Sequence, residues 1–293
     1  MRQTAESLQP YEELIERRGE IVYHSVGDRD LNLDIMVPRK HKTPLPVIFW
    51  IHGGGWGWRG IRGSYRERMQ IPLAAAGYCA IGVEYRLSVE AIFPAQIIDI
   101  KRAIRYVRTH ADELGVDADR FGIWGRSAGG HLATLAGTTI GSAKFGVDLD
   151  RVHAVVSCFG PTDLSVILDE LVPEREAHIR RISKIFLGGE IEDRLELVSL
   201  ANPISHLEHD DGSTQSLPRF LFVHGKLDAS VPFSQSRLLH DRLRQTGEKS
   251  DLVAVENAGH GLLRAIEGKE VEPPIEEIHQ IIRTFFDSAL KGT

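Results

Sequence analysis

The feature that most constrains the fold of this chain is a glycine-flanked serine between a strand-like run and a helix-like run. The pentapeptide GRSAG at 125–129 follows the apolar stretch 120–124 and precedes the alanine-rich stretch 131–136. In such a strand–turn–helix, small residues on both sides of the serine let the strand and the helix pass close together, and the hydroxyl is exposed at the end of a sheet. The pattern G-x-S-x-G alone is weak evidence, because glycine and serine are common. Its context predicts a nucleophile at Ser127.

Strand-like and helix-like runs alternate along most of the 293 residues. This alternation is typical of an α/β protein with a mostly parallel sheet that helices cover on both faces. The length suits a single domain, which we expect to span 1–293. Strands 21–24 and 31–36 are expected to form an antiparallel pair through Gly27-Asp28, and a long helix over 94–114 to end at Gly115. Further strands are predicted at 46–51, 78–84, 120–124, 152–157, 219–223 and 251–255, and a last helix at 275–290.

The segment 164–205 interrupts this alternation. It is long for a plain connection, and long insertions are often functional. We expect a helix over 175–187, started by Pro173-Glu174 and ended by Gly188-Gly189. The segment is either a cap that shapes a substrate pocket or an ordinary helix at the edge of the domain. Four residues are expected to share the apolar face of this helix, namely Ile179, Ile182, Ile185 and Phe186.

A second glycine-rich segment lies upstream of the serine. The strand-like run at 46–51 leads into His52 and three consecutive glycines, in the sequence PVIFWIHGGGW. Consecutive glycines cost conformational entropy, so packing alone explains them poorly. Attack by a serine on an ester creates an oxyanion, and fixed N–H donors stabilise it. We therefore expect the N–H groups of Gly54, Gly55 and Ala128 to form an oxyanion hole; the alternative is a flexible glycine turn.

An acid and a base follow in the order that completes a catalytic triad. Asp228 lies in a loop after the strand-like run FLFV, and His260 lies in a glycine-flanked loop after another apolar run. The chain order Ser127, Asp228, His260 is that of α/β-hydrolases and differs from the order in trypsin-like or subtilisin-like proteases. A serine hydroxyl needs a base to take its proton, and an imidazole can do so near neutral pH. The aspartate would hold the imidazole in the correct tautomer.

Other residues compete for these roles. Asp251 begins a strand and Glu256 lies near the end of the same strand, so the loop residue Asp228 is preferred as the acid. His224 precedes the acid loop, which is the wrong place for the base. His131, at the start of the helix after the serine, is expected to support the turn.

The glycine-rich segment has neighbours of its own. His52 is expected to orient the glycines through a hydrogen bond. Trp56 and Trp58 follow these glycines, and an aromatic wall for an acyl or aryl group is one interpretation of them. We predict that Trp56 contacts the substrate. The alternative is that its ring packs behind the site without touching the substrate.

The chain resembles α/β-hydrolase esterases of the hormone-sensitive-lipase-like group, and more closely the bacterial branch related to bifunctional feruloyl and acetyl esterases. The resemblance implies the α/β-hydrolase fold and a serine esterase that hydrolyses short-chain or aromatic esters (acetyl, feruloyl or aryl) through an acyl-enzyme. It departs from the usual pattern at Glu84, where lipase-like families carry aspartate, and at Lys226. The matching stretches are WIHGGGW at 50–56, VEYRLSVEAIFPAQIIDIKRAIRYVR at 83–108, GIWGRSAGGHLATLAGTT at 122–139, FGPTDL at 159–164, FVHGKLDASVPFSQSRLL at 222–239 and NAGHG at 257–261.

Two other functions share parts of this pattern. An arylformamidase or small amidase uses the same triad, and turnover of aryl esters against formylated anilines separates the two. A non-catalytic receptor on the hydrolase fold is disfavoured because all three triad residues are present, and function is argued from residues and not from fold.

Composition and charge narrow the remaining classes. The net charge of −6 gives no basic footprint for nucleic acid, so the expected partner is a small-molecule or carbohydrate-linked ester. Cys79 and Cys158 lie in apolar runs and are interpreted as buried residues with no disulfide; no metal-ligand spacing is present, and no cofactor is expected. The polar stretch 1–20 is not typical of a signal peptide, and no segment is long and apolar enough for a membrane span. We expect a cytoplasmic protein, or a secreted one if a native signal peptide has been removed.

Overall fold

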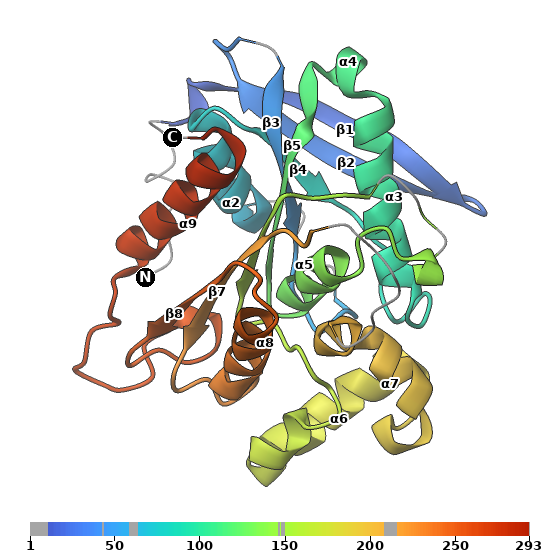
Figure 1. Ribbon diagram of the computed structural model, residues 1–293, viewed down its shortest axis with the longest axis vertical. Coiled ribbons are helices and arrows are strands. Elements are labelled where there is room, and N and C mark those ends of the chain that lie inside the picture. Colours follow the sequence, from blue (N-terminus) through green and yellow to red (C-terminus); the bar gives the residue numbers. More distant parts are fainter. Residues whose placement is uncertain are drawn as a thin grey trace.

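One sheet of eight strands forms the centre of the molecule, with helices on both of its faces (Figure 1). The computed structural model describes residues 11–42, 44–58, 64–145, 147, 150–207 and 216–292. The strand order across the sheet is β1-β2-β4-β3-β5-β6-β7-β8. The strands are β1 (Ile15–Val26), β2 (Arg29–Pro38), β3 (Leu45–Ile51), β4 (Cys79–Val83), β5 (Val116–Arg126), β6 (Ala154–Cys158), β7 (Arg219–Gly225) and β8 (Ser250–Val255).

The predicted, mostly parallel α/β sheet is confirmed. β1 and β2 form an antiparallel hairpin, β2 pairs antiparallel with β4, and the remaining strands pair in parallel. The carboxyl ends of the parallel strands therefore meet at one edge of the sheet, which is where ligands bind in folds of this class. Every triad residue predicted from the sequence follows one of these carboxyl ends.

Side chains of the central strands alternate between two hydrophobic layers. In β3, Val47 and Phe49 belong to one buried cluster and Ile48 and Trp50 to the other. The first layer packs under α3, α5 and α8, and the second under α2 and α9. Burying a side chain of this size contributes about 1.5–3 kcal/mol. The helices are α2 (Ser64–Ala75), α3 (Ala95–Thr109), α4 (Ala111–Leu114), α5 (Ala128–Thr138), α6 (Pro173–Leu187), α7 (Leu195–Ala201), α8 (Phe233–Gln245) and α9 (Ile275–Leu290).

The helix expected over 94–114 is in fact two helices. α3 ends at Thr109, and the short α4 follows His110, whose φ and ψ are −111° and 24°. The Thr109 hydroxyl and the His110 ring both bond to the carbonyl of Tyr106, at 3.0 and 2.9 Å. Side chains that compete for a main-chain carbonyl in this way weaken the next turn of a helix. The expected end at Gly115 is confirmed, with φ 68°.

Between β6 and β7 the described residues form α6, α7 and three 3-10 turns (Figure 1). α6 ends at Gly188 in the left-handed conformation, as expected. Ile179, Ile182 and Phe186 are buried, but the prediction that Ile185 shares their face is wrong, because that side chain is 39% exposed. Successive residues are about 100° apart around a helix, so Ile185 lies about 60° from Ile182 on the side away from Ile179 and Phe186.

Candidate active site

A sharp turn from β5 into α5 presents Ser127. The residue has φ 52° and ψ −124°, a strained backbone that persists only where its surroundings over-determine it. An added Cβ on Gly125 would lie 2.0 Å from the carbonyl oxygen of Gly129, and one on Gly129 would lie 2.2 Å from that of Ile51. Only glycine fits at either position. The Ser127 N–H donates to the carbonyl of Cys158 at 2.9 Å, which fixes the turn against β6.

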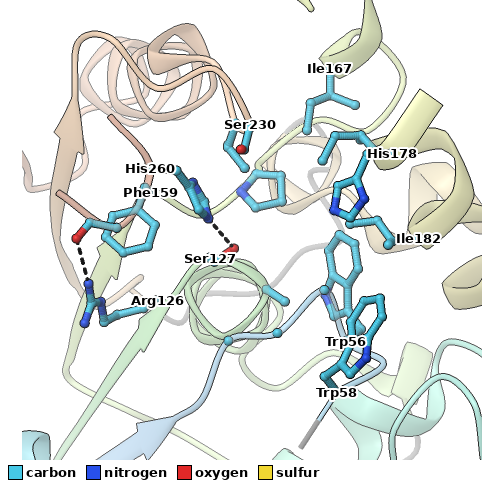
Figure 2. A pocket seen from close by; sticks show the side chains of 18 residues that line it. Trp56, Trp58, Arg126, Ser127, Phe159, Ile167, His178, Ile182, Ser230 and His260 are labelled. Carbon is cyan, nitrogen blue, oxygen red and sulfur yellow. Dashed lines mark hydrogen bonds between the residues drawn. The ribbon is translucent and has the colours of Figure 1, made fainter. Parts of the chain in front are cut away.

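The structure brings Ser127, Asp228 and His260 together from three separate loops. His260 Nδ1–H donates to Asp228 Oδ2 at 2.8 Å, and the Ser127 hydroxyl lies 3.1 Å from His260 Nε2 (Figure 2). A neutral imidazole that donates from Nδ1 has its free lone pair on Nε2. This tautomer is the one that can accept a proton from the serine.

The carboxylate of Asp228 is fixed by several donors. Its Oδ1 accepts the N–H groups of Ser230 and Val231 at 2.8 and 2.9 Å. Burial by itself raises the pKa of Asp228. The hydrogen bonds from His224 and His260 together lower it by more than burial raises it, so the net pKa lies well below its ordinary value. Asp228 therefore stays ionised and accepts the hydrogen bond from His260 Nδ1–H.

His224 is a supporting residue whose place the sequence analysis missed. It is fully buried, and its Nε2 lies 3.4 Å from Asp228 Oδ2 and donates to the carbonyl of Val231 at 2.9 Å. Ser236 donates to its Nδ1, at 2.7 Å. The spacing could have indicated this contact, because His224 lies at the end of β7 and Asp228 follows it by four residues in the next loop. The buried ring thus contacts both Asp228 and Val231 and holds the loop between them in place.

The competing acids lie elsewhere. Asp251 is exposed on β8, and Glu256 accepts a hydrogen bond from Lys226 at 2.8 Å. His260 Nδ1–H donates instead to Asp228 Oδ2 at 2.8 Å. Of these three acids, Asp228 is the one that the structure places against the imidazole.

The predicted oxyanion-hole residues border the same cavity as Ser127. Gly54, Gly55 and Ala128 all line it, and no hydrogen bond within the described part of the chain uses their N–H groups. Gly54 has φ 111°, and an added Cβ would lie 2.7 Å from the carbonyl oxygen of Trp58. Ala128 is the first residue of α5, where the N–H groups of a helix have no partner within the helix. The arrangement leaves three donors available to a ligand.

Two histidines hold the surroundings of these donors in place. His52 Nδ1–H donates to the carbonyl of Gly53 at 2.7 Å, in line with the expectation that it orients the glycines. His131 Nδ1 accepts the indole N–H of Trp56 at 3.1 Å, so the ring carries its proton on Nε2, which donates to the carbonyl of Ala201 at 2.8 Å. Burial lowers the pKa of His131 to about 4, despite the bond to that carbonyl. The neutral ring joins α5, α7 and the glycine-rich loop.

The two tryptophans differ in what they offer a ligand. Trp56 borders the cavity, but it is only 3% exposed and its ring stacks on Phe186 with centroids 4.3 Å apart. The expectation of an open aromatic wall at Trp56 is therefore corrected, because most of its surface supports the loop. Trp58 also borders the cavity and is 54% exposed. It is the tryptophan that presents a broad indole face at the opening.

The cavity beside Ser127 has a volume of about 470 Å³. α6 supplies His178, Ile179 and Ile182 to the wall across from His260 (Figure 2). The His178 ring makes no hydrogen bond within the described part of the chain and points into the cavity. The other lining side chains are those of Trp56, Trp58, Arg126, Phe159, Pro161, Ile167, Ser230 and Val231. The wall is mainly apolar, with a few polar groups.

Both cysteines are free and buried, as expected from their apolar neighbours. Cys158 accepts the indole N–H of Trp124 at 3.3 Å. Among the residues that the structure describes, no group of three or more His, Cys, Asp or Glu side chains is placed to share a metal ion.

Residues 33–243 match the model of the protein family described as BD-FAE. The chain is similar to the esterase LipC of Mycobacterium tuberculosis, at 31% identity over 226 residues, which are 74% of this chain and 53% of LipC. It is also similar to the probable carboxylic ester hydrolase LipM of the same species, at 33% identity over 240 residues, 79% of this chain and 52% of LipM. The chain thus spans about half the length of these two curated relatives.

Among solved structures, the fold is similar to that of a truncated carbohydrate esterase from gut microbiota. The TM-score is 0.74 at 28% sequence identity, and the likeness covers 94% of this chain and 96% of that one.

Proposed function

This chain belongs to the BD-FAE family and to the α/β-hydrolase esterases of the hormone-sensitive-lipase-like group, and from this premise we propose that it hydrolyses carboxylic esters with Ser127 as the nucleophile. One observation carries the proposal. The hydrogen bonds from Asp228 through His260 to Ser127, at 2.8 and 3.1 Å, end on a strained serine at the floor of a cavity. A base and its orienting acid are what a serine hydroxyl needs to attack an ester.

The proposed reaction has two halves. Ser127 Oγ attacks the ester carbonyl carbon while its proton moves to His260 Nε2, and the carbonyl π electrons become an oxyanion. The N–H groups of Gly54, Gly55 and Ala128 donate hydrogen bonds to this oxyanion, each such donor contributing about 3 kcal/mol. Collapse of the intermediate expels the alcohol, which takes the proton from His260. In the second half, water attacks the acyl carbonyl carbon and gives a proton to His260 Nε2. The second tetrahedral intermediate collapses, the bond to Ser127 Oγ breaks and the acid leaves. His260 returns the proton to Ser127 and restores its hydroxyl.

The cavity supports a short or aromatic acyl group as the substrate. A volume of about 470 Å³ lies within the range for small-molecule sites, and the α6 wall is apolar at Ile179 and Ile182. The broad face of Trp58 favours a flat ring. His178, which has no hydrogen-bond partner among the described residues, can bond to a hydroxyl on that ring or on the alcohol. Acetyl, aryl and feruloyl esters, including carbohydrate-linked ones, are the class we propose.

The test compares wild type with Ser127→Ala on p-nitrophenyl acetate, methyl ferulate and acetylated xylan. The alanine variant is expected to keep the wild-type melting temperature and lose nearly all hydrolysis, because no acyl-enzyme can form. A serine-reactive phosphonate should label Ser127 in the wild type and nothing in the variant. Wild-type-like turnover by the alanine variant would contradict the proposal. Faster turnover of formylated anilines than of any ester would indicate the amidase alternative.

A further inference from the structure

We propose that Arg126, the residue between Gly125 and Ser127, is a positioning residue that holds the loop of His260. The inference rests on the proposed ester hydrolysis, because it assigns the group that places the proposed base. Arg126 Nη2–H donates to the carbonyl of Gly261 at 3.1 Å, and Gly261 directly follows His260 (Figure 2). The arginine that precedes the nucleophile thus bonds the residue that follows the base.

A second contact runs through Phe159. The Arg126 guanidinium lies 5.0 Å from the centroid of the Phe159 ring, a favourable distance for a cation over an aromatic face. The same ring packs against the imidazole of His260, with centroids 5.0 Å apart and planes at 70°. Phe159 therefore stands between the arginine and the base and contacts both.

Phe159 itself is held in an uncommon conformation. Its φ is 44°, in the left-handed region that costs a residue with a side chain on the order of 1–3 kcal/mol. Its N–H donates to the carbonyl of Val223 at 2.9 Å, which anchors it to β7. Backbone strain at a residue that packs on the proposed base indicates that the ring position matters to the site.

The loop that carries His260 needs such external contacts. Glycines flank the histidine on both sides, and Gly261 and Leu262 have φ of 75° and 59°. On the upstream side, the N–H of Leu227 donates to the carbonyl of Ala258 at 2.9 Å. On the downstream side, the hydrogen bond from Arg126 holds the carbonyl of Gly261. The His260 side chain is 34% exposed, so solid packing does not fix the ring on every side. Within the loop, the N–H of Gly259 donates to the carbonyl of Leu263 at 2.8 Å. The arginine and the phenylalanine add contacts from outside the loop, on His260 and on the residue after it.

The chain contains a matched control for this contact. Arg108 on α3 lies 4.5 Å from the centroid of the Phe121 ring and donates to the carbonyls of Ala118 and Arg151. The chemistry is the same as at Arg126, an arginine over a phenylalanine with hydrogen bonds to main-chain oxygens. Phe121 lies in β5, several residues before the serine, so this contact is remote from the cavity. Its removal tests what loss of such a contact does to stability alone.

The experiment measures kcat, KM and melting temperature for Arg126→Met, Arg126→Lys, Phe159→Leu and Arg108→Met on p-nitrophenyl acetate. A base misplaced by about 1 Å costs on the order of a hundredfold in rate, so Arg126→Met is expected to lower kcat about tenfold to a hundredfold with KM within about twofold. Arg126→Lys should recover part of kcat, because its ammonium keeps a cation over the ring and a donor. Arg108→Met should lower the melting temperature but keep kcat within about twofold of wild type.

Two further readouts separate positioning from general destabilisation. The effects of Arg126→Met and Phe159→Leu on kcat should not be additive, because each breaks the same set of contacts. The rate of phosphonate labelling at Ser127 should fall in parallel with kcat. Unchanged kcat in Arg126→Met, a change in KM alone, or an equal loss of kcat in Arg108→Met would each overturn the inference. A wild-type chain that hydrolyses esters and labels at Ser127 keeps the proposed function standing whatever the arginine variants do.

Discussion

At the scale of single residues, the two carboxylate oxygens of Asp228 have different hydrogen-bond partners. One oxygen accepts hydrogen bonds from main-chain N–H groups that fix the loop, and the other accepts the hydrogen bond from His260 Nδ1–H. Asp228→Asn keeps the size of the side chain but favours the wrong imidazole tautomer, so we expect kcat for p-nitrophenyl acetate to fall about ten-thousandfold. The control is Asp251→Asn, an exposed aspartate on β8, which should stay within about twofold of wild type. A larger loss in the control would move the acid to that residue.

His131 predicts a pH dependence of stability. Its pKa is lowered by burial to about 4 in the folded chain, against an ordinary value of 6.5. Between these values the unfolded chain binds a proton that the folded chain does not, so stability is lost as the pH falls from 6.5 to 4. The gap corresponds to about 3 kcal/mol. His131→Gln can keep both hydrogen bonds without titrating.

Denaturant unfolding at pH 7 and pH 4 measures this effect. The free energy of unfolding of wild type should fall by about 3 kcal/mol more than that of His131→Gln over this interval. Subtracting the variant removes the contribution of the other histidines whose pKa is lowered, such as His153 and His279. Parallel pH profiles for the two proteins would show that His131 titrates normally.

The sequence could predict the three residues of the proposed triad because each stands in a recognisable loop in a fixed chain order. It could not predict the contacts of His224 or Arg126. His224 contacts Asp228 only because the loop between them folds back on the strand end. Arg126 contacts Gly261, which is 135 residues away in the sequence. Such contacts depend on the distance between loops in space. For Trp56, the sequence showed that the residue follows the glycines, but it did not show that the ring is buried against Phe186.

At the scale of elements, α6 decides the depth of the cavity. Ile182 faces inward, and its Cδ1 lies 3.2 Å from where a Cβ on Gly55 would stand, so the helix closes directly over the glycine-rich loop. Ile182→Ala should lengthen the acyl site and raise the kcat/KM ratio of octanoyl to butyryl esters about tenfold. It should also cost about 2 kcal/mol of stability. Ile185→Ala, on the exposed side of α6, is the control and should change neither quantity.

An acyl-length series with aryl esters of each variant gives these ratios directly. Equal shifts in the two variants would mean that α6 acts on the site only through overall stability. An unchanged preference in Ile182→Ala would place the acyl group on the other side of the cavity, toward Phe159 and Val231.

Element types followed from the sequence more closely than element ends. The last helix and six of the strands agree with prediction to within a few residues, because their apolar runs are bounded by glycine, proline or polar clusters. β1 is longer than expected: it begins at Ile15 among charged residues, and its ladder to β2 supplies main-chain bonds that an apolar pattern does not reveal. The break at His110 was invisible for a similar reason, since it depends on side chains that bond a single carbonyl.

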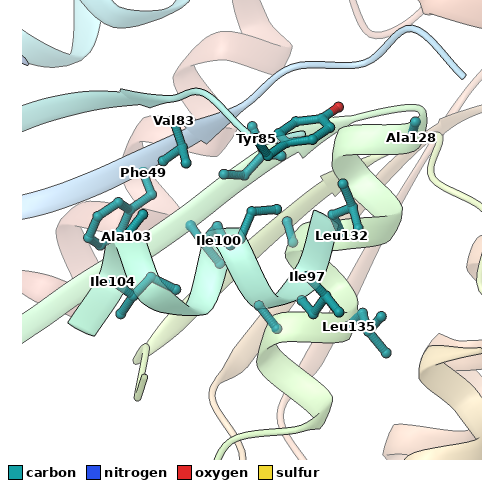
Figure 3. Packing of buried hydrophobic residues seen from close by; sticks show 14 of the residues in the cluster. Phe49, Val83, Tyr85, Ile97, Ile100, Ala103, Ile104, Ala128, Leu132 and Leu135 are labelled. Carbon is teal, nitrogen blue, oxygen red and sulfur yellow. The ribbon is translucent and has the colours of Figure 1, made fainter. Parts of the chain in front are cut away.

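At the scale of the whole molecule, alternating strands and helices predicted the class of fold but not the order of the strands. Ile97, Ile100 and Ile104 of α3 pack with Phe49 of β3 and Leu132 of α5 in one layer (Figure 3). The placement of β4 between β2 and β3 follows from pairings between distant segments, which a one-dimensional pattern does not specify.

The surface around the cavity bears on substrates that form lipid interfaces. None of the described helices has the length and apolar character needed to cross a membrane. On α6, Arg180 forms ion pairs with Glu176 and Glu192 at 3.1 and 2.6 Å, which leaves charge at the outer face of the segment over the site. Binding to a lipid interface scales with the apolar area that enters it. A charged outer face and a cavity of about 470 Å³ both favour short, dispersed esters.

We therefore expect acetyl to butyryl p-nitrophenyl esters to have a higher kcat/KM than dodecanoyl esters, because a long chain extends beyond the α6 wall into water. With tributyrin, the rate should saturate smoothly as concentration passes the solubility limit, since no large apolar surface is available to meet the droplet. The measurement is an initial-rate curve on both sides of that limit, with Ser127→Ala as the blank. A jump in rate once droplets form, or faster turnover of the dodecanoyl ester, would show that the segment between β6 and β7 opens to an interface, and would leave the assignment of Ser127, Asp228 and His260 intact.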